Sequence, residues 1–415
     1  MIIALRAEMV ARVIHVRSYV LRCLVYLTCV GTSLCAIGHA DALSGITIPL
    51  QYQPQYGIYT AVIKVGKNPL QTVEAIVDTG SSMMVFVADK DYCPNCGSAL
   101  TKGTVNPLKI QPVNTNKELT VNYGSARDTV IEYDAPIQYD EKETKSFVMK
   151  VFMLKESNQP SSVMGMIQHN LKFNPAKFTP FLVKMTENFN KYSQVTFVLC
   201  ADKGKSYFHV GPTKLSQFLV KTKLLKSQFY EINSSGFYDD TNKSISKPKH
   251  AYGRAILDTG TGGFILMTPR LYKPLLDYLY THAGLKNQQI SPKFWYENYC
   301  VLRKSIDFNA LPLLKIGLKS LKDNRPYYLK LSPTTYINQA GCGEGYVRLV
   351  FDQNVPSHLF TALRNQHARV AAGSTPDMVI GTSLFENYAI TISYKPDPSI
   401  AFYDNKTLCS WDTSI

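Results

Sequence analysis

Two short stretches repeat one another and constrain the fold more than any other feature of this chain. Residues 75–82 read AIVDTGSS, and residues 255–262 read AILDTGTG. In both, apolar residues lead into Asp-Thr-Gly, which is the pattern of a buried strand that ends in a tight turn. Each turn presents one carboxyl group, from Asp78 or Asp258, and a glycine that lets another segment approach the backbone closely. We therefore expect a chain of two related halves, each with one such turn.

If the two turns face each other, they bring Asp78 and Asp258 together. Two negative charges at short range repel, so the pair would hold one proton between its carboxyl groups. The ionised carboxyl could then act as a base toward a water molecule while the protonated carboxyl acts as an acid. This chemistry hydrolyses a peptide bond without a metal ion or a covalent intermediate.

With both motifs present, the chain resembles the pepsin-like aspartic proteases. The resemblance extends to two later stretches in which apolar residues precede a glycine: residues 161–166 read SSVMGM, and residues 378–382 read MVIGT. In this family such a strand crosses beneath each catalytic turn, and the two stretches here follow their motifs in the same order. The resemblance implies an all-β dominated, bilobal double-psi β-barrel architecture with a few short helices and a central cleft.

The resemblance also assigns roles to the residues of the two motifs. Asp78 and Asp258 would be the catalytic pair that holds the attacking water. The supporting residues are Ser81 and Thr261, expected to hydrogen-bond the outer carboxylate oxygens, Thr79 and Thr259, expected to bond to the opposite turn, and Gly80 and Gly260, expected to offer backbone groups to the substrate.

A hairpin with a Tyr-Gly tip is expected in the first half, because residues 119–126 and 129–133 alternate as strands do. In the resembled family, such a hairpin closes over the substrate and excludes water. The resemblance makes Tyr123, Gly124 and Ser125 the tip of this flap. It also places Ile76, Val163 and Tyr123 beside an apolar side chain of the substrate. The alternative is an ordinary hairpin with an aromatic residue.

The sequence departs from the family pattern at three places. Residues 83–85 read MMV where the family usually has Asn-Leu-Trp, so the tryptophan that normally bonds the flap tyrosine is missing. Gly262 stands where a second hydroxyl residue is common. Thr382 replaces an acidic residue that is found in members acting at low pH, which argues against a strongly acidic optimum. None of the three changes removes a catalytic group.

Composition sets broader bounds. A chain of 415 residues, 45% hydrophobic and 18% charged, suits a folded globular protein with room for two domains. The 26 Tyr and 19 Phe favour β structure. The net charge of +14 is spread along the chain without a nucleic-acid-binding motif, so a solvated basic surface is favoured over a nucleic-acid partner. We expect no metal or other cofactor, polypeptide substrates as the partners, and a monomer.

Residues 1–42 have the pattern of a secretory signal peptide. Arginines precede an uncharged run from Cys23 to Gly38, and small residues follow up to Ala42. The run is short for a membrane span, so we expect no stable membrane insertion after cleavage. We predict export to a secreted, periplasmic or endolysosomal location, with a retained signal-anchor as the alternative. Residues 43–215 would then form the N-terminal lobe with the flap, and residues 216–415 the C-terminal lobe.

The nine cysteines fit an exported protein. Three fall in the predicted signal, and six remain, an even number that suggests disulfides. A CxxC pair at residues 93–96 favours a small loop bridge over a zinc or redox motif, because no second pair and no nearby histidine accompany it. The resemblance supports Cys93–Cys96 and implies Cys300–Cys342. Cys200 and Cys409 remain for a third pair.

We predict an aspartic endopeptidase that cleaves extended peptides between apolar residues. The alternative is a pepsin-fold binding or inhibitor protein without activity, although such relatives usually lose a catalytic aspartate, a glycine or the following hydroxyl. The sequence also predicts one strand and one helix at defined positions. Residues 45–50 favour an edge strand, and residues 268–280 favour a helix, capped by Thr268, that Pro274 would kink.

Overall fold

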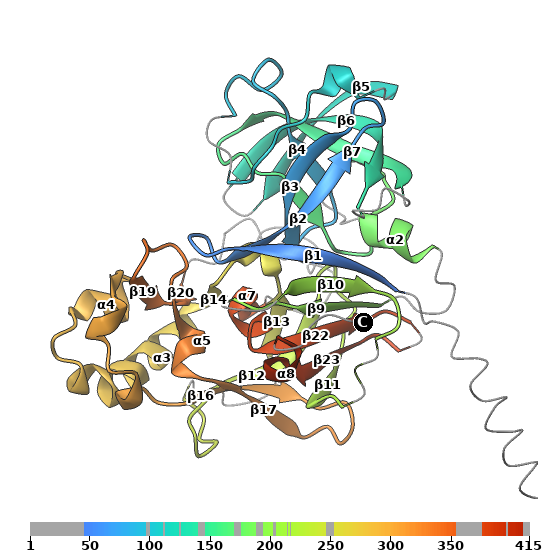
Figure 1. The fold of residues 1–415 in the computed structure, drawn as a ribbon. Helices are drawn as coiled ribbons and strands as arrows, with labels where there is room; N and C mark the ends of the chain where they lie inside the picture. The colour runs from blue at the N-terminus through green and yellow to red at the C-terminus, as the bar shows by residue number, and fades with distance from the viewer. Residues whose placement is uncertain are drawn as a thin grey trace, which may run out of the picture. The chain divides into compact units, whose positions relative to one another are not determined.

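The computed structural model describes residues 45–96, 100–110, 113–123, 126–139, 146–169, 176–187, 194–201, 205–213, 215, 217–245, 253–353, 376–395 and 397–409. These residues are mostly β structure, which confirms the predicted all-β class (Figure 1). The predicted signal peptide, residues 1–42, lies outside them. Within the described residues, no helix combines the length and the apolar character that a membrane-crossing segment needs.

The largest sheet has 13 strands in the order β11-β23-β22-β9-β10-β1-β2-β3-β8-β4-β7-β6-β5. Its strands from the first half are β1 (Ile46–Gln53), β2 (Ile58–Val65), β3 (Gln71–Asp78), β4 (Met84–Val87), β5 (Val113–Tyr123), β6 (Ala126–Gln138), β7 (Ser146–Ser157), β8 (Val163–Gly165), β9 (Gln194–Val198) and β10 (Ser206–Val210). The second half adds β11 (Val220–Lys223), β22 (Tyr388–Ser393) and β23 (Ser399–Asp404). This sheet therefore joins strands from both sides of the expected lobe boundary at residues 215/216, and the division into two lobes stays a prediction.

Two smaller sheets come from the second half of the chain. The seven-stranded sheet has the order β17 (Pro326–Leu331), β16 (Leu314–Lys319), β12 (Glu231–Tyr238), β13 (Gly253–Leu257), β21 (Met378–Ile380), β14 (Ile265–Met267) and β20 (Phe351–Asp352). The three-stranded sheet has the order β15 (Val301–Leu302), β19 (Tyr346–Leu349) and β18 (Ile337–Asn338). Together they place the second Asp-Thr-Gly motif at the end of β13.

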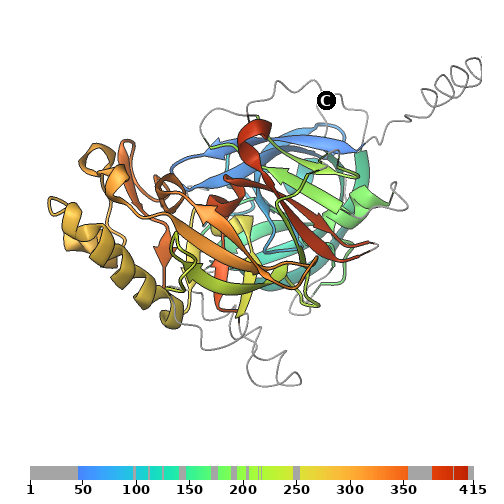
Figure 2. The same cartoon turned by 90° about the horizontal axis from the view of Figure 1, so that it is seen from below.

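The helices are short apart from one. They are α2 (Phe181–Thr186), α3 (Pro269–His282), α4 (Pro292–Tyr296), α5 (Pro333–Tyr336), α7 (Thr382–Phe385) and α8 (Asn405–Leu408), with 3-10 turns η1 (Pro107–Lys109), η2 (Thr259–Thr261), η3 (Gly284–Lys286), η4 (Arg303–Ser305) and η5 (Phe308–Ala310). The gold helices α3 and α4 lie to one side of the second-half strands (Figures 1 and 2). The expected helix is α3, and it continues through Pro274.

One four-strand unit occurs twice and positions the repeated motifs. In the first half, β8 lies between β3, to which it is parallel, and β4, to which it is antiparallel, and β4 pairs in parallel with β7. In the second half, β21 lies in the same way between β13 and β14, and β14 pairs in parallel with β20. In each unit, the strand that ends at the Asp-Thr-Gly turn and the strand that follows the turn both pair with the central strand, one on each side.

Residues 46–50 of strand β1 are paired on one side only, as expected of an edge strand, although the whole strand lies between β10 and β2 in the sheet order. Residues 46–50 pair with β10 on one side, and residues 51–53 pair with β2. Its side chains alternate, with Ile46, Ile48 and Leu50 buried and the residues between them exposed. Pro49, which has no N–H to donate, is tolerated because only one side of that stretch is paired. The strand changes its partner instead of ending a sheet.

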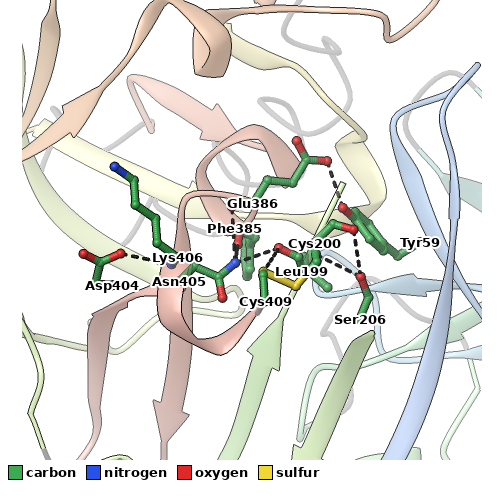
Figure 3. The surroundings of a disulfide bond; sticks show 10 residues. All are labelled: Tyr59, Leu199, Cys200, Ser206, Phe385, Glu386, Asp404, Asn405, Lys406 and Cys409. Atoms are coloured by element: carbon green, nitrogen blue, oxygen red, sulfur yellow. Dashed lines mark hydrogen bonds between the residues drawn. A yellow bond between two sulfur atoms is a disulfide. The ribbon is translucent and has the colours of Figure 1, made fainter. Parts of the chain in front are cut away.

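Three disulfides join the six cysteines in the expected pairs, which are Cys93–Cys96, Cys200–Cys409 and Cys300–Cys342. Disulfides persist in oxidising compartments, so this supports an extracellular type of environment. The Cys200–Cys409 bond lies among segments from distant parts of the chain (Figure 3). Beside it, the Asn405 side-chain amide donates hydrogen bonds to the carbonyls of Leu199, Phe385 and Glu386.

Glycines let the central strands β8 and β21 approach the turns. A Cβ on Gly165 would lie 2.5 Å from the backbone nitrogen of Met83 and 2.5 Å from the backbone carbon of Ser82. A Cβ on Gly381 would likewise meet the carbonyl oxygens of Gly262 and Phe264. Both are the glycines of the two apolar-apolar-Gly stretches. Glycine is needed at these positions because a side chain would clash with the backbone of the turn.

We predict that Gly165→Ala destabilises the protein by about 3 kcal/mol or more, because the clash is with backbone atoms that cannot rotate away. Gly343→Ala is the matched control, since a Cβ at Gly343 would meet nothing within 4 Å. The control should stay within about 1 kcal/mol of the unchanged protein. Urea unfolding measures both, and equal midpoints for the two variants would contradict the close packing of β8 against the turn.

Candidate functional site

The two Asp-Thr-Gly turns carry the candidate site. Asp78 is the last residue of β3, and Asp258 follows β13 as the N-cap of the 3-10 turn η2. Asp78 is buried, with 9% of its surface exposed, and Asp258 is half-buried. In each turn the carboxylate is held locally, because the N–H of Gly80 donates to Asp78 Oδ1 at 2.7 Å and the N–H of Gly260 donates to Asp258 Oδ1 at 2.9 Å.

The structure brings the two carboxyl groups against each other. A Cβ built on Gly80 would lie 2.6 Å from Asp258 Cγ, and one built on Gly260 would lie 2.7 Å from Asp78 Cγ. Each glycine therefore leaves room for the carboxyl group of the opposite turn. The two carboxyl groups therefore lie within the range at which each affects the ionisation of the other.

Burial and the neighbouring carboxyl change the acidity of Asp78. Removal from water raises the pKa of Asp78 well above its usual range, and the charge of Asp258 raises it further. The N–H of Gly80 and the polar hydroxyl of Ser81 act in the opposite direction and lower the pKa. The pair can therefore keep a proton at a pH at which an exposed aspartate has lost it.

Thr79 and Thr259 form a reciprocal set of buried hydrogen bonds between the turns. The N–H of Thr79 donates to Thr259 Oγ1 at 3.1 Å, and the N–H of Thr259 donates to Thr79 Oγ1 at 2.9 Å. Each hydroxyl also donates to a carbonyl of the opposite strand: Thr79 to Leu257 at 3.0 Å and Thr259 to Val77 at 2.5 Å. This set fixes the spacing of the two carboxyl groups.

The two residues expected to orient the carboxylates differ. Thr261 Oγ1 donates to Asp258 Oδ2 at 2.8 Å, as the resemblance implies. The equivalent Ser81 hydroxyl is buried near Asp78 but makes no hydrogen bond of ordinary geometry within the described structure.

Consecutive backbone N–H groups after β8 hold the first turn. Gly165, Met166 and Ile167 donate to the carbonyls of Met83, Asp78 and Ser81, at 2.9, 2.8 and 2.9 Å. After β21, Thr382 donates its N–H to the carbonyl of Gly262 at 2.6 Å. Its buried hydroxyl donates to the carbonyl of Gly57 at 2.7 Å, so Thr382 links the second turn to the first half. Sequence reasoning identified Thr382 only as a missing acid.

The expected substrate-facing residues occupy adjacent strands. Ile76 on β3 pairs in register with Val163 on β8. Because Ile76 lies two residues before Asp78, the side chains of Ile76 and Asp78 point to the same face of β3. The expected hairpin is present as β5 and β6, with Tyr123 paired to Ala126. The other two flap residues, Gly124 and Ser125, lie outside the described residues.

Asp128 is a buried carboxyl in this hairpin that sequence reasoning missed, because an Arg-Asp-Thr stretch suggests an exposed strand. It pairs with Val121 on β5 and with Ser157 on β7, and it accepts a hydrogen bond from Ser157 Oγ at 2.6 Å. Burial raises the pKa of Asp128 to about 6, although the Ser157 bond lowers it in part.

The described residues contain no group of three or more His, Cys, Asp or Glu side chains that could hold a metal ion. No protein-family model matches the chain, and no curated protein matches it either. The candidate site therefore depends on the sequence motifs and on the geometry of the turns.

The Thr79 and Thr259 hydroxyls should stabilise the whole protein more than an ordinary threonine pair. We predict that Thr79→Val and Thr259→Val each lower the free energy of unfolding by about 2–4 kcal/mol, because each leaves an N–H of the opposite turn buried without a partner. Thr196→Val is the matched control, since Thr196 and Thr391 share a single buried hydroxyl bond of 2.8 Å. Urea unfolding that shows equal losses for all three variants would contradict this role.

Asp128→Asn should stabilise the protein increasingly as the pH rises from about 4 to about 6. A raised folded-state pKa means that the folded chain keeps its proton longer than the unfolded chain, so folding stability falls across this window. The asparagine removes that loss, and the difference should reach about 3 kcal/mol at neutral pH. Unfolding curves at several pH values measure it. Asp323→Asn should show the opposite trend, because hydrogen bonds lower the pKa of Asp323.

Proposed function

We propose that this protein is an aspartic endopeptidase that hydrolyses extended polypeptides between apolar residues. The observation that carries the proposal is the pair of carboxyl groups of Asp78, which is buried, and Asp258, which is half-buried, placed against each other at the ends of two equivalent turns. Two carboxyls in this arrangement retain one proton and supply an acid and a base together.

The repeated unit of four strands supports a bilobal, double-psi architecture of the pepsin type. The units β3-β8-β4-β7 and β13-β21-β14-β20 share their strand directions and their order along the chain. Each ends its first strand in an Asp-Thr-Gly turn and packs a glycine of its central strand beneath that turn. Under this proposal, residues 43–215 and 216–415 form the two lobes.

The reaction follows from the shared proton. The ionised carboxyl takes a proton from a water molecule as the water oxygen attacks the carbonyl carbon of the peptide, and the neutral carboxyl gives its proton to the carbonyl oxygen. The tetrahedral intermediate then collapses, the C–N bond breaks, and the leaving nitrogen receives a proton. Because the proton belongs to the coupled pair, the roles of acid and base are assigned to the dyad as a whole.

Other residues would bind the substrate. Ile76 and Val163 would contact an apolar side chain next to the cleaved bond, and the hairpin with Tyr123 would close over the peptide as a flap. The three disulfides support work in an oxidising compartment, in line with export of a monomer by the N-terminal signal.

The test is digestion of denatured haemoglobin by the purified protein over about pH 3 to 7, where coupled carboxyls titrate. We expect cleavage that pepstatin, an inhibitor of aspartic proteases, blocks. Asp78→Asn should lower the rate by a factor of about 10³ or more, because the variant has lost one of the two proton-transfer groups. Thr196→Val serves as a control, since its hydroxyl bonds to Thr391 and its loss leaves both carboxyls in place.

Absence of cleavage by a folded sample at every pH would contradict the proposal. That result would favour the alternative, a binding or inhibitor protein that keeps the fold without activity. Cleavage that persists unchanged in Asp78→Asn would show that another group performs the chemistry. The pH profile would also show whether Thr382, in place of an acid, moves the optimum away from strongly acidic conditions.

A further inference from the structure

Tyr230 is a fully buried tyrosine that contacts the support of both turns, although it belongs to neither motif. It lies just before β12 with 1% of its surface exposed. Its hydroxyl donates to the carbonyl of Met166 at 2.5 Å, and its own carbonyl accepts from the N–H of Leu257 at 2.9 Å. One residue of the second half thus holds a segment of the first half and the strand that leads to Asp258.

The hydroxyl is linked to the backbone of Asp78 through one residue, Met166. Met166, whose carbonyl binds Tyr230, donates its N–H to the carbonyl of Asp78 at 2.8 Å. The next residue, Ile167, donates to the carbonyl of Ser81. Movement of this short segment would therefore move the first turn as a body. Leu257, held by the carbonyl of Tyr230, directly precedes Asp258.

A second tyrosine supports the first. The rings of Tyr230 and Tyr394 pack with their centroids 5.6 Å apart. Tyr394 also accepts a long hydrogen bond of 3.4 Å from the N–H of Gln168. The two phenols from the second half therefore face residues 166–168 together.

We propose that Tyr230 is a positioning residue for the aspartate pair. The hydroxyl of Tyr230 fixes the position of the first turn relative to the second. This inference rests on the proposed function, because it assigns Tyr230 a role in the same site. In the opposite direction, the hydroxyl of Thr382 links the second turn to the first half by donating to the carbonyl of Gly57.

Three titratable groups among the described residues lie next to this link in space or in sequence. Asp258 faces Asp78 across the turns, and its effect raises the pKa of Asp78. Glu231, next to Tyr230, forms an ion pair with Arg254. His169 follows the segment; the residue is exposed, and partial desolvation of its ring lowers its pKa. Because His169 could titrate in the range of interest, a His169→Gln variant belongs in the experiment.

The experiment compares Tyr230→Phe with Tyr336→Phe. Tyr336 is equally buried and donates its hydroxyl to the carbonyl of Pro312 at 2.7 Å, away from both turns, so the two variants lose the same kind of bond. The first readout is a carbon-13 NMR titration of the aspartate carboxyls in the full chain, with Asp78 assigned by its loss in Asp78→Asn. This readout requires no substrate.

We expect the titration of Asp78 to move toward lower pH by about half a unit or more in Tyr230→Phe, because a loosened first turn weakens the burial and the contact that raise its pKa. Tyr336→Phe and His169→Gln should leave it unchanged. The second readout is peptide hydrolysis, in which Tyr230→Phe should lower kcat about tenfold with KM within about twofold, as expected for misplaced catalytic groups.

An Asp78 titration that is identical in Tyr230→Phe and Tyr336→Phe would overturn the inference. If Tyr230→Phe does not fold, Tyr394→Phe replaces it, with a smaller shift expected in the same direction and no shift counting against the inference. The proposed function fails separately, when the unchanged protein cleaves nothing although its Asp78 titration responds to Tyr230→Phe. An active unchanged protein with an unmoved titration overturns the role of Tyr230 alone.

Discussion

The reciprocal hydrogen bonds of Thr79 and Thr259 are the interaction on which the candidate site depends. Each threonine uses its N–H and its hydroxyl toward the opposite turn, so neither turn satisfies its own buried polar groups. The two halves of the chain must meet before either turn is complete. The same contact forces two carboxyl groups together, a cost in electrostatic repulsion that the hydroxyl network offsets.

The two turns are equivalent in topology but not in support. The first turn rests on consecutive N–H groups after β8, and a tyrosine from the second half holds that segment in place. The second turn is held after β21 by Thr382, which also reaches the first half. Asp78 is buried, whereas Asp258 is half-buried. The two carboxyl groups therefore have different surroundings before any substrate binds, and burial favours the protonated form of Asp78.

The repeated motifs predicted which residues would meet, because Asp-Thr-Gly after an apolar run restricts the backbone to a strand and a tight turn. The glycines of the two later stretches were also predictable, since nothing larger fits beneath a turn. The partner change of β1 was not predictable, because pairing is decided by distant strands and not by its own alternation. Asp128 and Tyr230 escaped notice for the same reason, as the contacts that bury them come from segments remote in sequence.

The hydrogen bonds of Asn405 have a consequence for how the chain can be produced. Residues 405–407 read NKT, the acceptor pattern for N-linked glycans. In the folded protein the amide nitrogen that would carry the sugar is committed to three backbone carbonyls beside the Cys200–Cys409 bond (Figure 3). A sugar added there during synthesis would prevent this packing and separate the two cysteines. A eukaryotic secretory host yields native protein only if the chain folds before Asn405 is modified.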